Sequence, residues 1–334
     1  GYDKLIWQQM SELGWTAITF PEELGGLAFS YKGLGAVFES MGKHLTASPM
    51  LSSVVLSGTV LQHLANQQQL TWLDGVINGE KRLALAIDEQ ARHNPSTISC
   101  TAVANTNGYI LSGEKAIVID GVSPDAWLVA AQYDNAVHLF VVPFSADVKV
   151  KATRLIDSRN YATLCFDNVQ LPVDALLGQS VESWSSANAL DFALDLGRLC
   201  LSCELLGAVK ALFAMTIEYL KTREQFGVKI GTFQALQHRA ARCFVELELA
   251  QSCVMSALST ADTDPENLAL SVSLAKWKLS KVADLITSEA IQMHGGIAVT
   301  DELDIGLYLK RIRVAQMLLG DADFHQARYM TLKG

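Results

Sequence analysis

The sequence predicts an α+β protein that begins with helices, continues as a small antiparallel β-barrel or sandwich, and ends in a four-helix bundle. Two changes of hydrophobic pattern support this order. Helical spacing of apolar residues gives way to short strand-like segments near Lys81 and returns near Ser183. The predicted domains are therefore residues 1–80, 81–180 and 181–334.

Apolar residues in the first part recur at three- and four-residue spacing, as on one face of a helix. This spacing predicts helices at Ser30 to Met41, Pro49 to Leu64 and Gln69 to Asn78. The string Phe20 to Gly26 contains a proline and two glycines, which are typical of a turn. The N-terminal part is thus expected to be helical.

Short segments rich in Val, Ile, Leu and Tyr follow, separated by Gly, Asn, Asp or Pro, which is typical of strands. Hairpin turns are predicted at Asn105 to Gly108 and at Asp134-Asn135. The strands are predicted at Arg82 to Ile87, Ile98 to Ala104, Gly108 to Ile119, Ala126 to Gln132, Val137 to Pro143 and Thr163 to Val169. Strands of this length and spacing favour an antiparallel barrel or sandwich.

Four long segments with helical spacing and short polar links make up the rest of the chain, as in an antiparallel bundle. They are Ala187 to Thr222, Thr232 to Thr260, Pro265 to Met293 and Asp304 to Leu318. Their apolar faces indicate an oligomer, although hydrophobic packing alone does not distinguish a like from an unlike subunit.

Composition limits the classes of partner. The 334 residues are 50% hydrophobic and 18% charged, which is enough to bury a large core. The net charge of −9 argues against nucleic acid as a partner, because a phosphate backbone requires a basic surface. Apolar runs such as Ala126 to Ala131 are shorter than the roughly 20 residues of a membrane span, so no span is expected. The first residues lack the pattern of a secretory signal, and a cytoplasmic location is expected.

The six cysteines lie mostly in apolar segments, as reduced core cysteines do in large intracellular proteins. Cys200 and Cys203 form a C-x-x-C pair, but a structural zinc site needs four ligands and no second cluster follows. Neither a disulfide nor a metal site is expected.

Three strings resemble motifs of the acyl-CoA dehydrogenase family. Gly14 to Gly26, G-W-T-A-I-T-F-P-E-E-L-G-G, is similar to the family's opening G-x-x-x-x-x-x-P-E-x-x-G-G. Tyr219 to Gln237 contains R-E-Q-F-G-V-K-I-G-T-F-Q-A-L-Q, similar to R-x-x-F-G-x-x-I-x-x-F-Q-x-x-Q. Ala290 to Thr300, A-I-Q-M-H-G-G-I-A-V-T, resembles Q-x-x-G-G-x-G, with Ala298 in place of the third glycine. The resemblance covers the whole chain and includes the order of its domains.

This resemblance implies FAD as cofactor, an acyl-CoA thioester as substrate, and an electron-transfer flavoprotein or similar acceptor. In the family an α proton leaves the thioester while hydride passes from the β carbon to the flavin. Arg223 would bind the FAD pyrophosphate, because a guanidinium can bind two phosphate oxygens. The remaining residues implied to contact FAD, in the family that of the neighbouring subunit, are Gln225, Phe226, Gln234, Gln292, Gly295 and Gly296. Taken singly, a charged helix end or a Gly-Gly pair is also typical of an ordinary helix terminus.

The segments that bind the flavin ring in the family depart from its pattern here. The counterpart of T-E-P-x-A-G-S-D is Ile87 to His93, without the proline and small residues. The counterpart of K-x-W-I-T-N is Lys115 to Asp120, with Ile117 and Ile119 in place of tryptophan and threonine. Isoleucine can neither donate a hydrogen bond to the flavin nor stack on it as an indole does. The chain's own flavin pocket is therefore expected to be degraded.

The catalytic base of the family is also missing. Leu319 stands where most members carry glutamate, and Gly197 stands at the alternative position. The remaining weak candidates are Glu204, Asp321 and Asp323. Charged residues near helix ends are mostly solvated or act as caps, so none of the three is assigned as the base.

Three hypotheses follow. The first is an accessory subunit that completes the FAD site of an unlike catalytic chain. Heterotetrameric family members with two chains of each kind resemble this chain in the same departures, and are associated with CoA thioesters of bulky steroid side chains. The second is a self-sufficient homo-oligomeric dehydrogenase with Glu204 or Asp321 as an unusual base. The third is a non-catalytic scaffold or binding protein with this fold.

Overall fold

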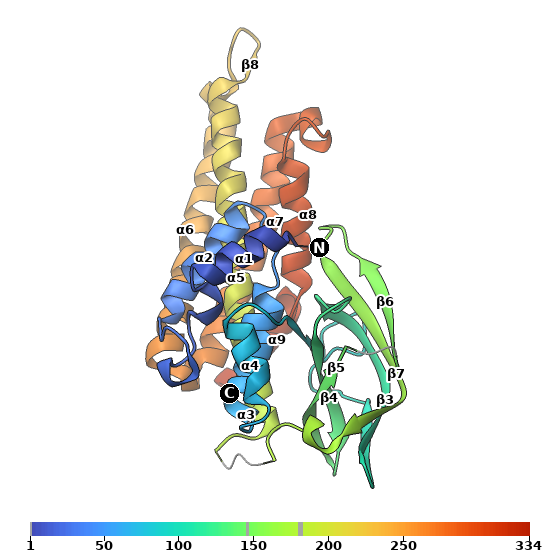
Figure 1. Ribbon diagram of the computed structural model, residues 1–334. Coiled ribbons are helices and arrows are strands. Elements are labelled where there is room, and N and C mark those ends of the chain that lie inside the picture. The colour runs from blue at the N-terminus through green and yellow to red at the C-terminus, as the bar shows by residue number, and fades with distance from the viewer. Residues whose placement is uncertain (1, 145–146, 180–182) are drawn as a thin grey trace. The chain divides into compact units, whose positions relative to one another are not determined.

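The structure is a computed structural model that describes residues 2–144, 147–179 and 183–334 (Figure 1). Helices, then a β-sheet, then further helices follow one another along the chain, as the sequence predicts. The chain forms two compact units, and each is drawn from two separate stretches of sequence.

The first unit comprises residues 1–30 and 47–197. Its first helix begins at Lys4, and the side chain of the preceding Asp3 accepts a hydrogen bond from the Leu5 amide and so caps the helix. The helical elements of this unit are α1 Lys4–Glu12, η1 Trp15–Ala17, η2 Glu22–Leu24, η3 Met50–Gly58, α3 Thr59–Leu64, α4 Leu70–Ile77 and η4 Val173–Ala175.

The segment predicted as one helix from Pro49 to Leu64 is instead a π-helical stretch, η3, followed by α3. All residues of η3 are buried. The Ser53 hydroxyl donates to the Leu83 carbonyl at 3.0 Å and accepts from the Leu83 amide at 2.9 Å. These bonds tie η3 to the first strand, and such long-range contacts override the local preference for an α-helix.

The strands form a curled sheet of mixed direction. Its strands are β1 Leu83–Ala86, β2 Thr101–Asn105, β3 Gly108–Ile119, β4 Ala126–Tyr133, β5 Ala136–Pro143, β6 Val148–Arg154 and β7 Asn160–Pro172. The order is β1-β4-β2-β3-β7-β6, with β5 paired to β4. Most neighbours are antiparallel as predicted, but β1 and β2 each pair with β4 in parallel. Trp127, Phe140 and Leu164 lie in the core of this sheet.

Both predicted hairpins are present. Asn105 pairs with Gly108 between β2 and β3, and Tyr133 pairs with Ala136 between β4 and β5. At the second turn, Asp134 and Asn135 have φ angles of 48° and 63°. Two consecutive positive φ angles are typical of the type I′ turn, which matches the twist of the strands.

The second unit comprises residues 31–46 and 198–334. The long helix α5 begins in the first unit and continues into this one. The helices are α2 Tyr31–Lys43, α5 Ser186–Thr222, α6 Gln234–Thr263, α7 Leu268–His294, α8 Ile305–Met317 and α9 Ala322–Lys333. The shorter elements are β8 Glu224–Gln225, β9 Val228–Lys229, η5 Ile230–Thr232, η6 Pro265–Asn267 and η7 Gly295–Val299. The four predicted bundle helices are α5 to α8, and the sequence did not predict α9.

Helix α2 packs on the bundle, although its sequence position lies in the predicted 1–80 domain. The Tyr31 amide donates to the Asp262 carboxylate at 2.7 Å, and Lys210 pairs with Glu39 at 2.7 Å. A Cβ added at Gly207 would lie 1.9 Å from the Glu39 carbonyl oxygen. The backbones of α2 and α5 therefore approach so closely that only glycine fits between them.

Among the described helices, α5 is long and apolar enough to cross a bilayer by length and composition. The sequence prediction missed this property because polar residues interrupt its apolar runs. However, 67% of the most apolar stretch of α5 is buried inside the protein, as in the central helix of a bundle.

Candidate functional site: a cofactor edge and an empty base position

A tight hairpin extends beyond the ends of α5 and α6 (Figure 1). Strands β8 and β9 pair on either side of Phe226 and Gly227, whose φ angles are 56° and 76°. Phenylalanine rarely adopts positive φ, and such a conformation costs on the order of 1 kcal/mol or more. The Phe226 side chain is nevertheless 91% exposed and contacts the Phe233 ring edge-on. The strained tip thus presents an aromatic ring to the surroundings.

Arg223 precedes this hairpin and is exposed. Its backbone continues the hydrogen bonding of α5, because the Arg223 amide donates to the Tyr219 carbonyl at 2.9 Å. Its carbonyl accepts from Ile230 at 2.9 Å. Within the described residues its guanidinium makes neither a hydrogen bond nor an ion pair. The backbone of Arg223 is therefore fixed while its side chain remains available to an outside anion.

The end of α7 is fixed beside the end of α5. The Tyr219 hydroxyl donates to the His294 carbonyl at 3.3 Å, and the two rings lie 4.3 Å apart between centroids. The His294 ring in turn donates through Nδ1 to the Ala290 carbonyl at 2.7 Å. Sequence reasoning did not identify this pair, which brings the ends of the two helices together.

The two glycines after α7 differ in what requires them. Gly295 has φ +69° and ψ −148°, a conformation that is essentially restricted to glycine. Gly296 has no such φ, and a Cβ added there would meet no atom within 4 Å. Neither backbone conformation nor packing within the described chain requires glycine at 296. An outside group that must approach the backbone closely would require it.

The first residue of α6 lies at the same end of the bundle. Helices α6 and α7 run antiparallel, since Arg239 pairs with Glu289 at 2.5 Å and Lys278 pairs with Glu246 at 2.6 Å. Gln234 therefore lies beside the last turn of α7. All the residues that the resemblance assigns to FAD are exposed, namely Arg223, Gln225, Phe226, Gln234, Gln292, Gly295 and Gly296. We call this set the cofactor edge.

The donors of the cofactor edge fit part of a dinucleotide. A guanidinium and glycine backbone suit pyrophosphate oxygens, while the amides of Gln225, Gln234 and Gln292 can both donate and accept. No flavin-ring partner occurs in this set. The edge fits the phosphate and adenosine half of FAD, and the flavin half would have to be bound by other residues.

The segments that correspond to the family's flavin-ring segments, Ile87 to His93 and Lys115 to Asp120, are joined by an ion pair between Lys115 and Glu89. The Lys115 ammonium, fully buried, donates to Glu89 at 2.8 Å and to the Ile87 carbonyl at 3.0 Å. The Glu89 carboxylate also accepts from the hydroxyl and amide of Ser99 and from the Cys100 amide. Burial alone would raise the pKa of Glu89, but these hydrogen bonds lower it to about 2. The polar groups of this loop therefore bond to one another.

Leu319, which the resemblance places where most members carry the base, lies on a turn held by several hydrogen bonds. Leu319 and Gly320 have φ angles of 56° and 110°. Arg198 donates through Nε to the Leu319 carbonyl at 3.1 Å. Lys276, fully buried, donates to the carbonyls of Ala315, Gln316 and Gly320 at 3.0, 3.0 and 3.1 Å. The turn is fixed by these bonds, but Leu319 has no group that can take a proton.

His325 lies beside the cationic groups of Arg198 and Lys276 at this turn. It is fully buried, and its Nε2 lies 3.2 Å from the Leu319 carbonyl, which can only accept. Burial and the neighbouring charges of Lys276, Arg198 and Arg328 keep the pKa of His325 far below its usual range. Burial, together with Arg198, also lowers the pKa of Lys276 to about 7. The His325 ring is therefore neutral, and its Nε2 donates to the Leu319 carbonyl. Sequence reasoning missed this cluster, because its members come from distant segments.

Two of the three weak base candidates, Glu204 and Asp321, have structural partners. The Glu204 carboxylate is buried and accepts from Arg311 at 3.1 Å, and Arg311 also donates to the Thr46 carbonyl. Asp321 caps α9 by accepting from the Phe324 amide at 2.8 Å. Asp323 is exposed in the first turn of α9. Their assignment as bases stays a prediction, and both Glu204 and Asp321 already have hydrogen-bond partners.

Comparison with known proteins agrees with the sequence resemblance. Models of the acyl-CoA dehydrogenase N-terminal and C-terminal domains match residues 1–80 and 187–329. The acyl-CoA dehydrogenase FadE12 of Mycobacterium tuberculosis is 27% identical over 326 residues, covering 93% of this chain and 83% of that protein.

Solved structures with the same fold include a Tcur3481-Tcur3483 steroid ACAD variant and the ChsE4-ChsE5 complex of Mycobacterium tuberculosis. The first is 28% identical with a TM-score of 0.87, covering 99% of this chain and 89% of that one. The second is 24% identical with a TM-score of 0.89, covering 99% and 88%. The chain therefore belongs to the acyl-CoA dehydrogenase family, oxidoreductases that act on CH–CH donors.

Proposed function

We propose that this chain is the accessory subunit of a hetero-oligomeric acyl-CoA dehydrogenase. It completes, through the cofactor edge, an FAD site whose flavin half and catalytic base belong to a different chain. The observation that carries the proposal is an asymmetry between two parts of one chain. The residues suited to a neighbour's FAD are present and exposed, whereas the base positions are Leu319 and Gly197.

The geometry of the flavin-ring segment supports the same assignment. Lys115 and Glu89 satisfy each other inside the protein, and Ile117 and Ile119 offer the flavin no hydrogen bond. A chain that held its own flavin would need donors in this segment. The proposal therefore gives this chain a binding role in which Arg223 holds the pyrophosphate.

The chemistry follows from the family. Bound FAD supplies the acceptor for hydride that leaves the β carbon of the acyl-CoA thioester. The residues of this chain bind and orient. The Arg223 guanidinium pairs with phosphate oxygens, the amides of Gln234 and Gln292 contact the adenosine half, and Gly296 leaves space for the ligand. We further propose a cytoplasmic complex that passes electrons to an electron-transfer flavoprotein or a similar acceptor.

The test is the visible flavin absorbance of the chain purified alone and after co-expression with any acyl-CoA dehydrogenase encoded beside it. We expect a colourless solitary chain and a complex with one FAD for each catalytic chain. Arg223→Ala should leave the complex assembled but lower its flavin content severalfold, while Arg154→Ala, an exposed arginine of β6, should not. One FAD per solitary chain would contradict the proposal and favour the homo-oligomeric alternative.

A further inference from the structure

The cofactor edge is assembled from segments that are distant in sequence. Arg223 follows α5, whereas Gln292, Gly295 and Gly296 lie at the end of α7. A ligand that contacts both segments binds well only where their spacing is fixed beforehand, because otherwise binding must also order them. The contacts that hold the end of α7 beside the end of α5 therefore affect how well the edge can bind FAD.

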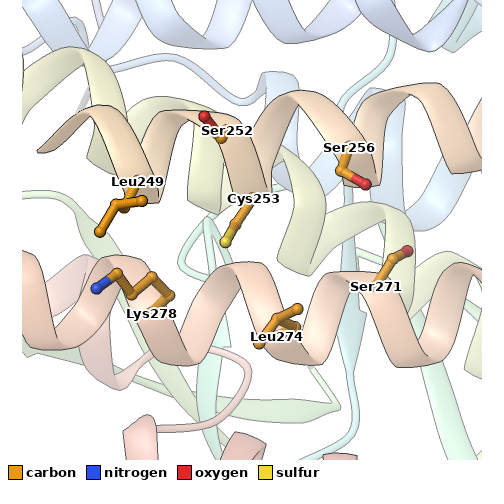
Figure 2. A pocket seen from close by; sticks show the side chains of 7 residues that line it. All are labelled: Leu249, Ser252, Cys253, Ser256, Ser271, Leu274 and Lys278. Carbon is orange, nitrogen blue, oxygen red and sulfur yellow. The ribbon is translucent and has the colours of Figure 1, made fainter. Parts of the chain in front are cut away.

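Helix α6 is one neighbour of α7, and the contact between them is interrupted. A groove of about 390 Å³ lies between the two helices, and Figure 2 shows Leu249 and Cys253 of α6 and Leu274 of α7 extending toward it. Nearer the cofactor edge, Arg239 of α6 pairs with Glu289 of α7, and these side chains are 39% and 21% exposed. An ion pair that is open to water stabilises little. These features favour a contact with α5 as the one that fixes the end of α7.

Tyr219 of α5 makes such a contact with His294, the last residue of α7. The Tyr219 hydroxyl donates to the His294 carbonyl at 3.3 Å, and the ring planes are inclined by 30° with centroids 4.3 Å apart. The neighbouring hydroxyls of α5 behave differently, since those of Thr216 and Thr222 each donate to a carbonyl of α5 at 2.8 Å. Tyr219 therefore uses its hydroxyl between helices rather than within its own helix.

Both members of this pair are bonded to the backbone beside residues of the cofactor edge. The Tyr219 carbonyl accepts from the Arg223 amide at 2.9 Å, so Tyr219 fixes the turn that carries the guanidinium. His294 directly precedes Gly295, and its ring is 6% exposed and donates through Nδ1 to the Ala290 carbonyl at 2.7 Å. A shift of either ring would therefore move Arg223 relative to Gly295.

We propose that Tyr219 and His294 are positioning residues for the FAD site, and this rests on the function proposed above. The hydroxyl bond and the ring contact set the spacing between the Arg223 guanidinium and the end of α7. The phosphate and adenosine parts of FAD then meet both segments at once, without the cost of ordering them. The pair acts through Arg223 and the α7 end, and it takes no part in the transfer of hydride.

The experiment uses the complex of the full chain with its FAD-carrying partner, stripped of flavin and titrated with FAD while flavin fluorescence is followed. Tyr219→Phe removes only the hydroxyl and should raise the Kd for FAD roughly fivefold to tenfold, the effect of one lost hydrogen bond. Thr216→Val removes a hydroxyl from the same helix and is the matched control, which should bind FAD like the wild type. His294→Ala should weaken binding as Tyr219→Phe does, and His294→Phe, which keeps a ring against Tyr219, should restore most of the affinity.

A double-mutant cycle separates positioning from general stabilisation. Because Tyr219 acts through the placement of Arg223, Tyr219→Phe should change the Kd for FAD by less than about twofold in the Arg223→Ala background. A full additional loss in that background would overturn the inference and leave the accessory function standing, as would wild-type affinity of Tyr219→Phe alone. An equal loss in Thr216→Val would assign the effect to the stability of α5 and would also overturn it. If Arg223→Ala leaves the affinity for FAD unchanged, the proposed function and the inference both fail.

Discussion

At the scale of single residues, buried charges in this protein hold backbone in place. Lys276 uses all three of its protons on carbonyls at the end of α8 and in the turn that follows. Such acceptors would otherwise be buried without partners, and each unmet acceptor costs about 1–3 kcal/mol. The ammonium therefore stabilises the turn that carries Leu319.

Replacing Lys276 with methionine tests this role. We expect Lys276→Met to lower the free energy of unfolding by about 3 kcal/mol, because the carbonyls lose their donor. Lys281→Met changes an exposed lysine on the same helix and should stay within about 0.5 kcal/mol of the wild type. Urea unfolding followed by circular dichroism gives both values. Equal losses in the two variants would contradict the assigned role.

Asp120 predicts a dependence of stability on pH. Burial raises its pKa from 3.8 to about 6, against the opposing hydrogen bond from the Ser52 hydroxyl at 2.6 Å. Because the folded protein favours the protonated form of this carboxyl, Asp120 contributes to the free energy of unfolding fully below pH 4. That contribution is lost as pH rises through 6.

The variant Asp120→Asn removes this titration and keeps an acceptor for Ser52. The variant should gain stability relative to the wild type as pH increases from 4 to about 6, with a constant difference above that range. Urea midpoints measured at unit intervals of pH give the comparison. A difference that does not change with pH would contradict burial of the charge as the cause.

The candidate site was predicted unevenly from sequence, for a physical reason. Residues of the cofactor edge lie in two local strings around Arg223 and Gln292, and local strings are visible in a sequence. The cluster of Arg198, Lys276 and His325 was missed, because its members lie on three different helices and far apart in sequence. Only the folded chain brings them to one turn.

At the scale of elements, the turn before α9 has a cap that can be separated from a catalytic role. Asparagine caps helices as well as aspartate does but cannot accept a proton at neutral pH. We expect Asp321→Ala to lower the free energy of unfolding by about 1 kcal/mol and Asp321→Asn to change it little. Acyl-CoA turnover by the complex should survive Asp321→Asn. Loss of turnover in that stable variant would identify Asp321 as a base after all.

The elements that were predicted well are those fixed by nearby residues. The hairpin at Asp134 and Asn135 follows from residues that tolerate positive φ, and β3 has the predicted bounds. The π-helical turn of η3 and the parallel pairing of β1 with β4 depend on partners distant in sequence. Helix α9 was missed because its pattern of apolar residues is weak. Local propensity does not specify such features.

At the scale of the whole molecule, close approach of backbones joins α2 to the bundle. Gly207 lies against the Glu39 carbonyl, so Gly207→Ala forces the helices apart and should lower the free energy of unfolding by about 2–3 kcal/mol. The matched control is Gly306→Ala on α8, where an added Cβ meets nothing within 4 Å. That variant should gain about 0.5 kcal/mol from higher helix propensity. Thermal unfolding of both variants measures the two changes in stability. Equal changes would contradict the conclusion that close backbone packing requires glycine at 207.

The packing of α2 on the bundle also affects the order in which the newly made protein folds. Tyr31 donates to Asp262, a residue 231 positions later in the chain. Ribosomes add about 5–20 residues per second, so α2 emerges roughly 10 to 50 s before its partner on α6 exists. Synthesis of the first unit is completed within that interval, before α2 has its partner on α6. We therefore expect the apolar side of α2, with Leu34 and Phe38, to stay exposed to chaperones until α6 has been made.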